Sequence, residues 1–197
     1  FSGEGISKQV GNDLLVTPGN FKIGGGFDSD NSKYFYGDIP SEYLLSPSEI
    51  IITMTDLSKE GDTLGYPAKV PNNPQIRYLH NQRIGRIAPQ KNPIYLEFVY
   101  WLMTSNRYRH WILSSATGST VRHTSPSRIK EFEFAISSER LINYFNKISL
   151  SMMKNIANQI NEISIIEKLK NTLLPKLISG DLGIPNAETM IEEVSVQ

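Results

Sequence analysis

The pattern of apolar and polar positions changes character near residue 140. Before that point, apolar residues fall in short runs separated by turns rich in glycine and proline, such as residues 17–20 (TPGN). The β-branched run at 50–54 (IIITM) predicts a buried strand, and residues 84–87 predict another. Residues 131–136 (EFEFAI) alternate polar and apolar side chains, which predicts a half-buried strand.

Two helices are expected in the same part of the chain. Asn92 can cap a helix whose first turn holds Pro93 and whose apolar body runs over residues 95–103. Ser125 followed by Pro126 predicts the start of a short second helix for the same reasons. Residues 1–140 are therefore predicted to form one α+β domain built on small mixed sheets.

The remainder of the chain predicts a single long helix. Residues 141–174 contain no glycine or proline, and apolar residues recur there at steps of three or four, from Leu141 to Leu173. This spacing predicts an amphipathic helix of about 34 residues, roughly 50 Å long. Its apolar stripe requires a partner helix in a coiled coil or bundle. We assign the helix to residues 141–178, with Gly180 as its stop, and residues 179–197 to a flexible tail.

Charge is distributed unevenly, although 20 basic and 20 acidic side chains give a formal net charge of zero. Residues 69–130 hold ten basic side chains and one acidic one, whereas the segments on either side are net acidic. Such a block is typical of a localised phosphate-binding face. The alternative is that folding disperses these charges over the surface.

Composition limits the class of protein further. The chain has no cysteine, which excludes a disulfide scaffold and a thiolate zinc site and is consistent with a reducing, cytoplasmic location. No apolar run approaches the roughly 20 residues of a membrane span, so no membrane partner is expected.

Candidate catalytic motifs are weak. Residues 92–95 (NPIY) resemble the Asn-Pro-Pro-Tyr loop of amino-methyltransferases, but the second proline is absent and no glycine-rich turn could hold a methyl donor. The histidines, His80, His110 and His123, are too dispersed to predict a metal site. We therefore expect no catalytic residues and no bound cofactor.

Four motifs in order resemble the specificity (S) subunit of type I restriction–modification systems. Residues 173–182 (LLPKLISGDL) resemble the end of the long helix in that family, and residues 81–86 (NQRIGR) resemble its "NQR-x-G" strand. Residues 118–126 (GSTVRHTSP) resemble its "G-S/T-T-V-x-H-x-S-P" turn. Residues 50–55 (IIITMT) resemble its "GDIIITMTG" segment, with Ser48-Glu49 in place of the usual Gly-Asp.

The resemblance covers about residues 10–182 and carries several implications. An S subunit has two target-recognition domains, each followed by a long helix, and each domain reads half of a split DNA site. This chain would supply one such half, as a half-subunit or fragment. Its helix would pack antiparallel against a second copy or a second half-subunit and would dock methyltransferase (M) subunits. The restriction (R) subunit would join through the complex.

The resemblance also implies that the chain is not an enzyme, because S-adenosylmethionine, ATP and magnesium belong to the partner subunits. Double-stranded DNA is the expected ligand. The residues that we predict to contact it combine arginine and lysine, which suit phosphates and guanine edges, with small polar groups. They are Lys69, Arg77, Arg83, Arg86, Arg107, Arg109, Ser119, Thr120, Arg122 and His123.

Three other interpretations remain open from the sequence. The chain could be the C-terminal recognition domain of a single-chain restriction–methylation enzyme. It could be a coiled-coil adaptor that does not bind DNA, with the basic block as solvated surface. It could also be a nuclease, although no paired-carboxylate signature supports that.

Overall fold

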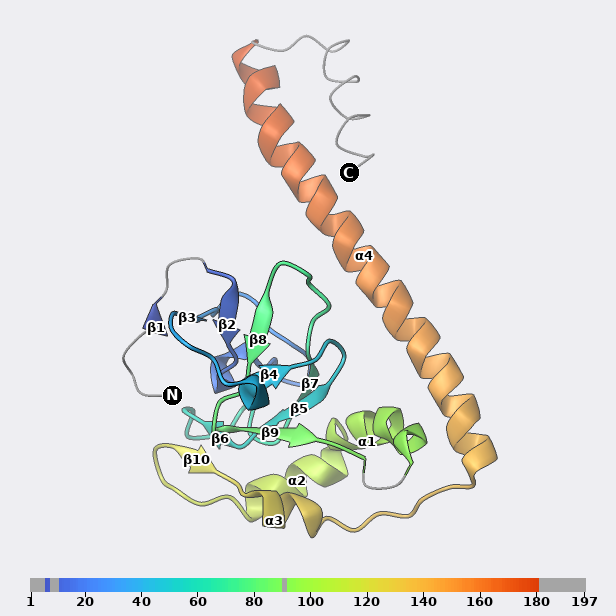
Figure 1. Ribbon diagram of the computed structural model, residues 1–197. Helices are drawn as coiled ribbons and strands as arrows, with labels where there is room; N and C mark the ends of the chain where they lie inside the picture. The colour runs from blue at the N-terminus through green and yellow to red at the C-terminus, as the bar shows by residue number, and fades with distance from the viewer. Residues whose placement is uncertain (1–5, 8–10, 90–91, 181–197) are drawn as a thin grey trace. The chain divides into compact units, whose positions relative to one another are not determined.

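The computed structural model describes residues 6–7, 11–89 and 92–180, and the chain divides into two compact units, 1–143 and 144–197. It is mixed α and β, with small sheets followed by one long C-terminal helix (Figure 1), as the sequence predicts. Most of the predicted tail, residues 179–197, lies outside the described residues. The strands are β1 Ile6–Ser7, β2 Asp13–Leu15, β3 Tyr34–Phe35, β4 Leu44–Leu45, β5 Ile50–Thr53, β6 Thr55–Asp56, β7 Pro67–Lys69, β8 Arg77–Leu79, β9 Ile84–Ile87 and β10 Arg122–His123.

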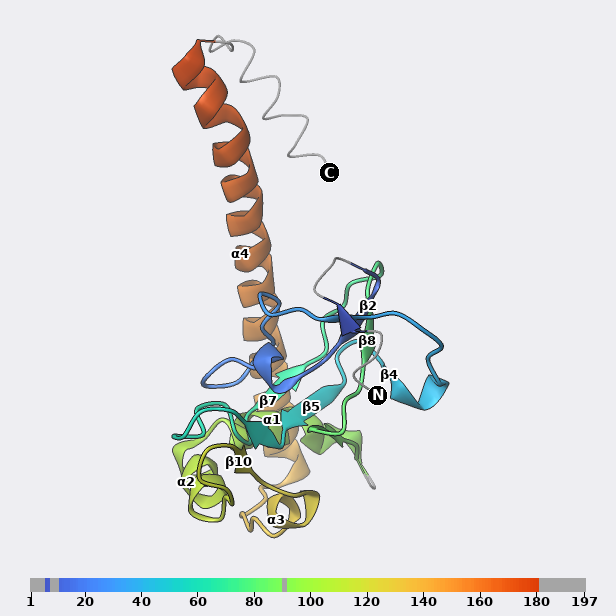
Figure 2. The same ribbon diagram turned by 90° about the vertical axis from the view of Figure 1, so that its left-hand side faces the viewer.

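The described strands form three sheets. One has five strands in the order β1-β3-β2-β8-β4, in which β2 and β8 run parallel and the other pairs are antiparallel. A second, antiparallel sheet has the order β7-β5-β9, and a third pairs β6 with β10. In both views β10 lies beside α2 and α3, whereas β2 and β8 lie at the opposite side of the sheets (Figures 1 and 2).

Strand β5 lies at the centre of the first unit, and all four of its residues are buried. Successive side chains on a strand point to opposite faces. Ile51 therefore packs into a core cluster with Leu14 and Tyr78, while Ile52 packs into a second cluster with Tyr108 and Ile112. Because both faces are covered, the strand carries a continuous apolar run. The predicted strand at 84–87 is confirmed, and the strand predicted at 50–54 is present as β5, one residue shorter at Met54.

Both predicted helix starts in the first unit carry side-chain caps. Asn92 Oδ1 accepts a hydrogen bond from the Ile94 amide at 3.0 Å, and Ser125 Oγ accepts one from the Arg128 amide at 3.3 Å. Both predicted helix starts are confirmed. The helical segments are η1 Pro18–Asn20, η2 Ser41–Tyr43, η3 Pro93–Tyr95, α1 Leu96–Met103, α2 Asn106–Ser114, α3 Pro126–Lys130 and α4 Glu139–Ser179.

Helix α2 is absent from the sequence prediction. Ser105 caps it through a hydrogen bond from the Tyr108 amide, and Tyr108 and Ile112, four residues apart, bury one face. A serine followed by an i, i+4 apolar pair was the available signal. Helix α2 lies within the polar, arginine-rich part of the basic block.

The predicted strand at 131–136 is wrong, because these residues form no strand. Phe132 packs edge-on against Tyr108 with ring centroids 5.2 Å apart, and Phe134 packs against Phe98 at 6.1 Å. The alternating pattern therefore comes from two aromatic rings that pack on α1 and α2. It does not come from pairing in a sheet.

Helix α4 has 41 residues, which corresponds to about 60 Å. It begins two residues before the predicted 141–178 and ends one residue after it, and Gly180 follows with φ of 76°. Pro175 lies inside the last turns. Several apolar side chains of the helix are exposed, among them Met152 (60%) and Ile160 (60%). None of the described helices has the length and apolarity needed to cross a membrane.

Candidate nucleic-acid interface

Three segments far apart in the sequence meet at Met54. The Met54 amide donates a hydrogen bond to the Arg83 carbonyl at 2.9 Å, and its carbonyl accepts one from the Thr124 amide at 3.0 Å. The end of β5, the turn before β9 and the segment after β10 are thereby joined through their backbones. These are the segments that carry three of the four motifs noted in the sequence.

The third segment forms a short hairpin, residues 117–123, which we call the β10 hairpin. Thr117 and His123 exchange two backbone hydrogen bonds of 2.9 and 3.0 Å, which close it. Gly118 has φ of 90°, and a Cβ there would overlap the Val121 carbonyl oxygen, so the turn requires glycine. The closed turn leaves Ser119 and Thr120 exposed at its tip.

Strands β6 and β10 bring two predicted contact residues to the same place. Arg122 lies opposite Asp56 in the register, and His123 lies opposite Thr55, whose Oγ1 is 3.2 Å from His123 Nδ1. His123 is exposed and Arg122 is half-buried. The site is therefore an exposed edge of a two-stranded sheet.

The loop that follows β6, residues 57–64, is held by an acidic side chain, and we call it the tied loop. Asp56 Oδ1 accepts a hydrogen bond from the Ser58 amide at 2.7 Å, and Oδ2 accepts from the amide and the hydroxyl of Thr63. Burial raises the pKa of Asp56, but the hydrogen bonds from Ser58 and Thr63 outweigh it and hold the pKa below its ordinary value. The ionised carboxylate is therefore the form that closes the loop.

Two predicted contact arginines also hold the tied loop. The Arg109 guanidinium donates to the carbonyls of Gly61 and Leu64, and it stacks over the Tyr66 ring at 4.6 Å. Arg122 Nε donates to the Lys59 carbonyl at 2.9 Å. These acceptors are neutral, and neither arginine forms an ion pair with a carboxylate among the described residues.

Three other predicted contact residues form ion pairs with carboxylates from distant segments. Lys69 pairs with Glu97 at 2.5 Å, Arg77 with Asp13 at 2.5 Å and Arg86 with Glu49 at 2.6 Å. The hydrogen bond and charge of Asp13 raise the pKa of Arg77 above its ordinary value. Each of these cations is neutralised locally, which weakens any attraction to phosphate.

Arg83 and Arg107 complete the set of ten. Arg83 is exposed, and no residue of the described chain forms an ion pair or hydrogen bond with its guanidinium. Arg107 is exposed as well; it donates to the Glu133 carbonyl at 3.3 Å and stacks over the Phe132 ring at 5.7 Å. The structure thus brings Arg83, Ser119, Thr120, Arg122 and His123 together around β6 and β10, with Arg109 beneath the tied loop.

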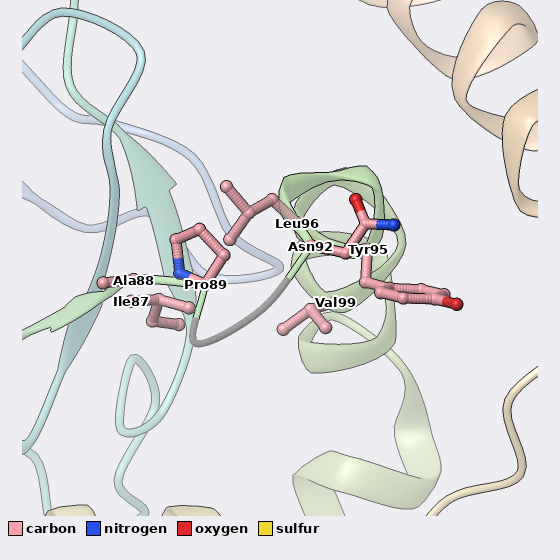
Figure 3. A pocket seen from close by; sticks show the side chains of 7 residues that line it. All are labelled: Ile87, Ala88, Pro89, Asn92, Tyr95, Leu96 and Val99. Carbon is pink, nitrogen blue, oxygen red and sulfur yellow. The ribbon is translucent and has the colours of Figure 1, made fainter.

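The pockets of the first unit offer little chemistry. One of about 340 Å³ lies between the end of β9 and the start of α1 (Figure 3); its lining is mostly apolar, including Ile87, Leu96 and Val99. Another, of about 660 Å³, lies between α2 and the segment after α3 and includes Arg107 and Trp111. Within the described ranges, no group of three or more histidine, aspartate or glutamate side chains could hold a metal ion.

No protein-family model matches this chain, and no curated protein is significantly similar to it.

The tied loop is the part of the site that sequence reasoning missed. An aspartate two residues before a serine is the usual signature of a side chain that closes a turn, and Asp56 and Ser58 fit it. Gly61 and Gly65, both with positive φ, mark the later bends. No local signal indicated that Arg109, 45 residues after Leu64, would reach the loop.

Proposed function

We propose that this chain is a DNA specificity subunit of a type I restriction–modification complex, and that it reads one half of a split DNA target. The observation that carries the proposal is the junction at Met54. Segments picked out by their resemblance to that family meet there, and two of them carry Arg83 and Arg122, which form no ion pair within the described residues. The meeting of these motif segments in one place supports the proposal.

Within this proposal, the phosphate contacts come from cations without a carboxylate partner. Arg83 and Arg122 are the foremost of these, and His123, Ser119 and Thr120 add polar groups at the same edge. Cations of this kind attract phosphates and give salt-dependent binding. Lys69, Arg77 and Arg86 are given no role in the proposed interface, because their charges are met by carboxylates.

The proposal gives helix α4 the role of the spacer. The helix would pack antiparallel against the helix of a second copy or a second half-subunit, and it would dock M subunits. The exposed apolar residues along it support this role, since a stripe that includes Ile148, Met152, Ile156 and Ile160 stays in water unless another helix covers it. Methyl transfer and DNA cleavage would belong to the M and R subunits.

The test maps methylated bases in cells that carry this chain with the M subunit of the same system. A split, two-part motif should be methylated, and deletion of the gene for this chain should abolish that methylation. A deletion strain that restores the chain from a plasmid is the control. Methylation of the same motif without the chain would contradict the proposal. A gene that continues upstream into a methyltransferase domain would favour the single-chain enzyme instead.

A further inference from the structure

The tied loop is unusually well fixed for an exposed loop. Asp56 closes its two ends, Ser58 Oγ accepts a hydrogen bond from the Asp62 amide at 2.8 Å, and Arg109 holds its far side from α2. The half-buried guanidinium of Arg109 meets two carbonyls and the Tyr66 ring, so it loses hydration without gaining an ion pair. Two charged side chains, Asp56 and Arg109, therefore hold the shape of this surface loop.

The fixed backbone presents a row of exposed side chains. Leu57 is 69% exposed, and Lys59, Glu60 and Asp62 are exposed after it. Side chains on a rigid loop lose less conformational entropy when they bind than side chains on a mobile one. Rigidity of this kind favours specific contacts over loose electrostatic attraction.

The position of the loop places this row at the proposed interface. Arg122 Nε donates to the Lys59 carbonyl, so the loop and the β10 hairpin are in direct contact. A duplex whose phosphates contact Arg122 therefore comes within reach of Lys59 and Glu60.

The charges on the loop indicate what it contacts. Phosphates repel carboxylates, so Glu60 and Asp62 disfavour a loop that tracks the DNA backbone. A carboxylate accepts a hydrogen bond from the cytosine amino group, lysine donates to guanine, and an apolar side chain contacts the thymine methyl group. Leu57, Lys59 and Glu60 together match base edges better than phosphates.

We propose that the tied loop reads bases, with Leu57, Lys59 and Glu60 as specificity-determining residues, while Arg83 and Arg122 contact the flanking phosphates. This inference rests on the proposed function and adds which residues contact bases and which contact phosphates. Arg109 is then a positioning residue, because it fixes the loop and does not itself contact the DNA.

The experiment incubates the full chain, assembled with the M subunits of its system, with a pool of duplex DNA that contains a randomised segment, and it sequences the bound fraction. Lys59→Ala and Glu60→Gln are compared with wild type, with Lys154→Ala on α4 as a matched control for loss of an exposed lysine. We expect each loop variant to lose about tenfold of the preference at one base position or more, with little change elsewhere. Arg83→Ala should weaken binding to all sequences without changing the preferred bases.

The outcomes separate the two proposals. Thermal melts that coincide with wild type show that the exposed-residue variants fold. If wild type binds DNA and both loop variants select the same sequences with the same preference, the inference is wrong and the proposed function stands. If wild type binds no DNA, the proposed function and the inference both fail.

A second comparison tests the positioning role. Arg109→Lys keeps one cation and part of the hydrogen bonding, whereas Arg109→Met removes both. We expect a loss of base preference for Arg109→Met that Arg109→Lys partly restores, measured at a temperature where both variants are folded. An unchanged preference in folded Arg109→Met would remove Arg109 from the account.

Discussion

Two regions of the basic block differ in what their cations meet. Near β7, β8 and β9, Lys69, Arg77 and Arg86 each face a carboxylate from another segment. Around β6 and β10, the hydrogen bonds of the Arg109 and Arg122 guanidinium groups go to carbonyl oxygens, and Arg109 also stacks over the Tyr66 ring. A carbonyl satisfies the donors of a guanidinium but leaves its charge in place.

This difference shows that the number of basic residues in a segment of the sequence does not give the positive charge that the folded surface presents. Residues 69–130 carry ten basic side chains, and folding pairs four of those described, Lys69, Arg77, Arg86 and Arg128, with carboxylates. Arg83 and Arg122, which form no ion pair within the described residues, belong to segments that meet at Met54. Cations without a carboxylate partner in the described residues therefore include Arg83 and Arg122 near β6 and β10, although the net charge of the chain is zero. Substituting an arginine in each region and comparing the effects tests this difference.

The largest expected effect is on folding. Arg109→Met should lower the free energy of unfolding by about 3 kcal/mol, because the carbonyls of Gly61 and Leu64 lose charged donors. Arg77→Met should leave stability unchanged within error, since its ion pair with Asp13 is exposed to solvent. Urea unfolding at neutral pH measures both. Equal losses in the two variants would remove the distinction between the regions.

A smaller effect is expected at Asp56 and depends on pH. The folded-state pKa of Asp56 is lowered, so its contribution to stability is full above the ordinary pKa of 3.8 and is lost as the pH falls through the folded value. Asp56→Asn should therefore cost about 1–2 kcal/mol at pH 7. The cost should shrink below about pH 4.

The measurement is urea unfolding of wild type and Asp56→Asn at several pH values from 7 to 3. Asp13→Asn serves as the matched carboxylate in the ion-paired region. A difference between wild type and Asp56→Asn that stays constant down to pH 3 would show that the charge of Asp56 does not close the loop.

The smallest expected effect lies beneath the interface. The Tyr108 hydroxyl is buried and has no hydrogen-bond partner among the described residues, and burial raises the pKa of Tyr108. Tyr108→Phe removes an unpaired polar atom and keeps the ring against Phe132. We expect stability to stay the same or rise by up to about 1 kcal/mol in thermal unfolding. A clear loss would show that the hydroxyl has a partner.

Local signals in the sequence predicted much of the fold. The apolar run of β5, the caps at Asn92 and Ser125, and the stop at Gly180 all depend on residues within a few positions of one another. The strand expected at 131–136 failed because periodicity does not reveal which surface an alternating pair of aromatic rings will cover.

The candidate site was less accessible to sequence reasoning. The ten predicted contact residues were chosen by type and motif, and the charges of the seven lysine and arginine residues among them looked equivalent in the sequence. Arg77 and Asp13 are 64 positions apart, and Arg109 and Gly61 are 48 apart, so only the fold distinguishes a neutralised cation from an available one.

The most direct test of the central claim is the salt dependence of DNA binding by two matched double variants. Arg83→Gln with Arg122→Gln removes two charges from the proposed interface, and Arg77→Gln with Arg86→Gln removes two from the ion-paired region. Glutamine keeps a donor in each case. Fluorescence anisotropy with a labelled duplex, over a series of salt concentrations, gives the slope of log K against log salt.

We expect wild-type binding to weaken steeply with salt, and the interface pair to reduce the slope by about 1.8, which corresponds to two phosphate contacts. The ion-paired control should leave the slope close to that of wild type. Equal slopes for the two double variants, or binding that does not respond to salt, would contradict the account.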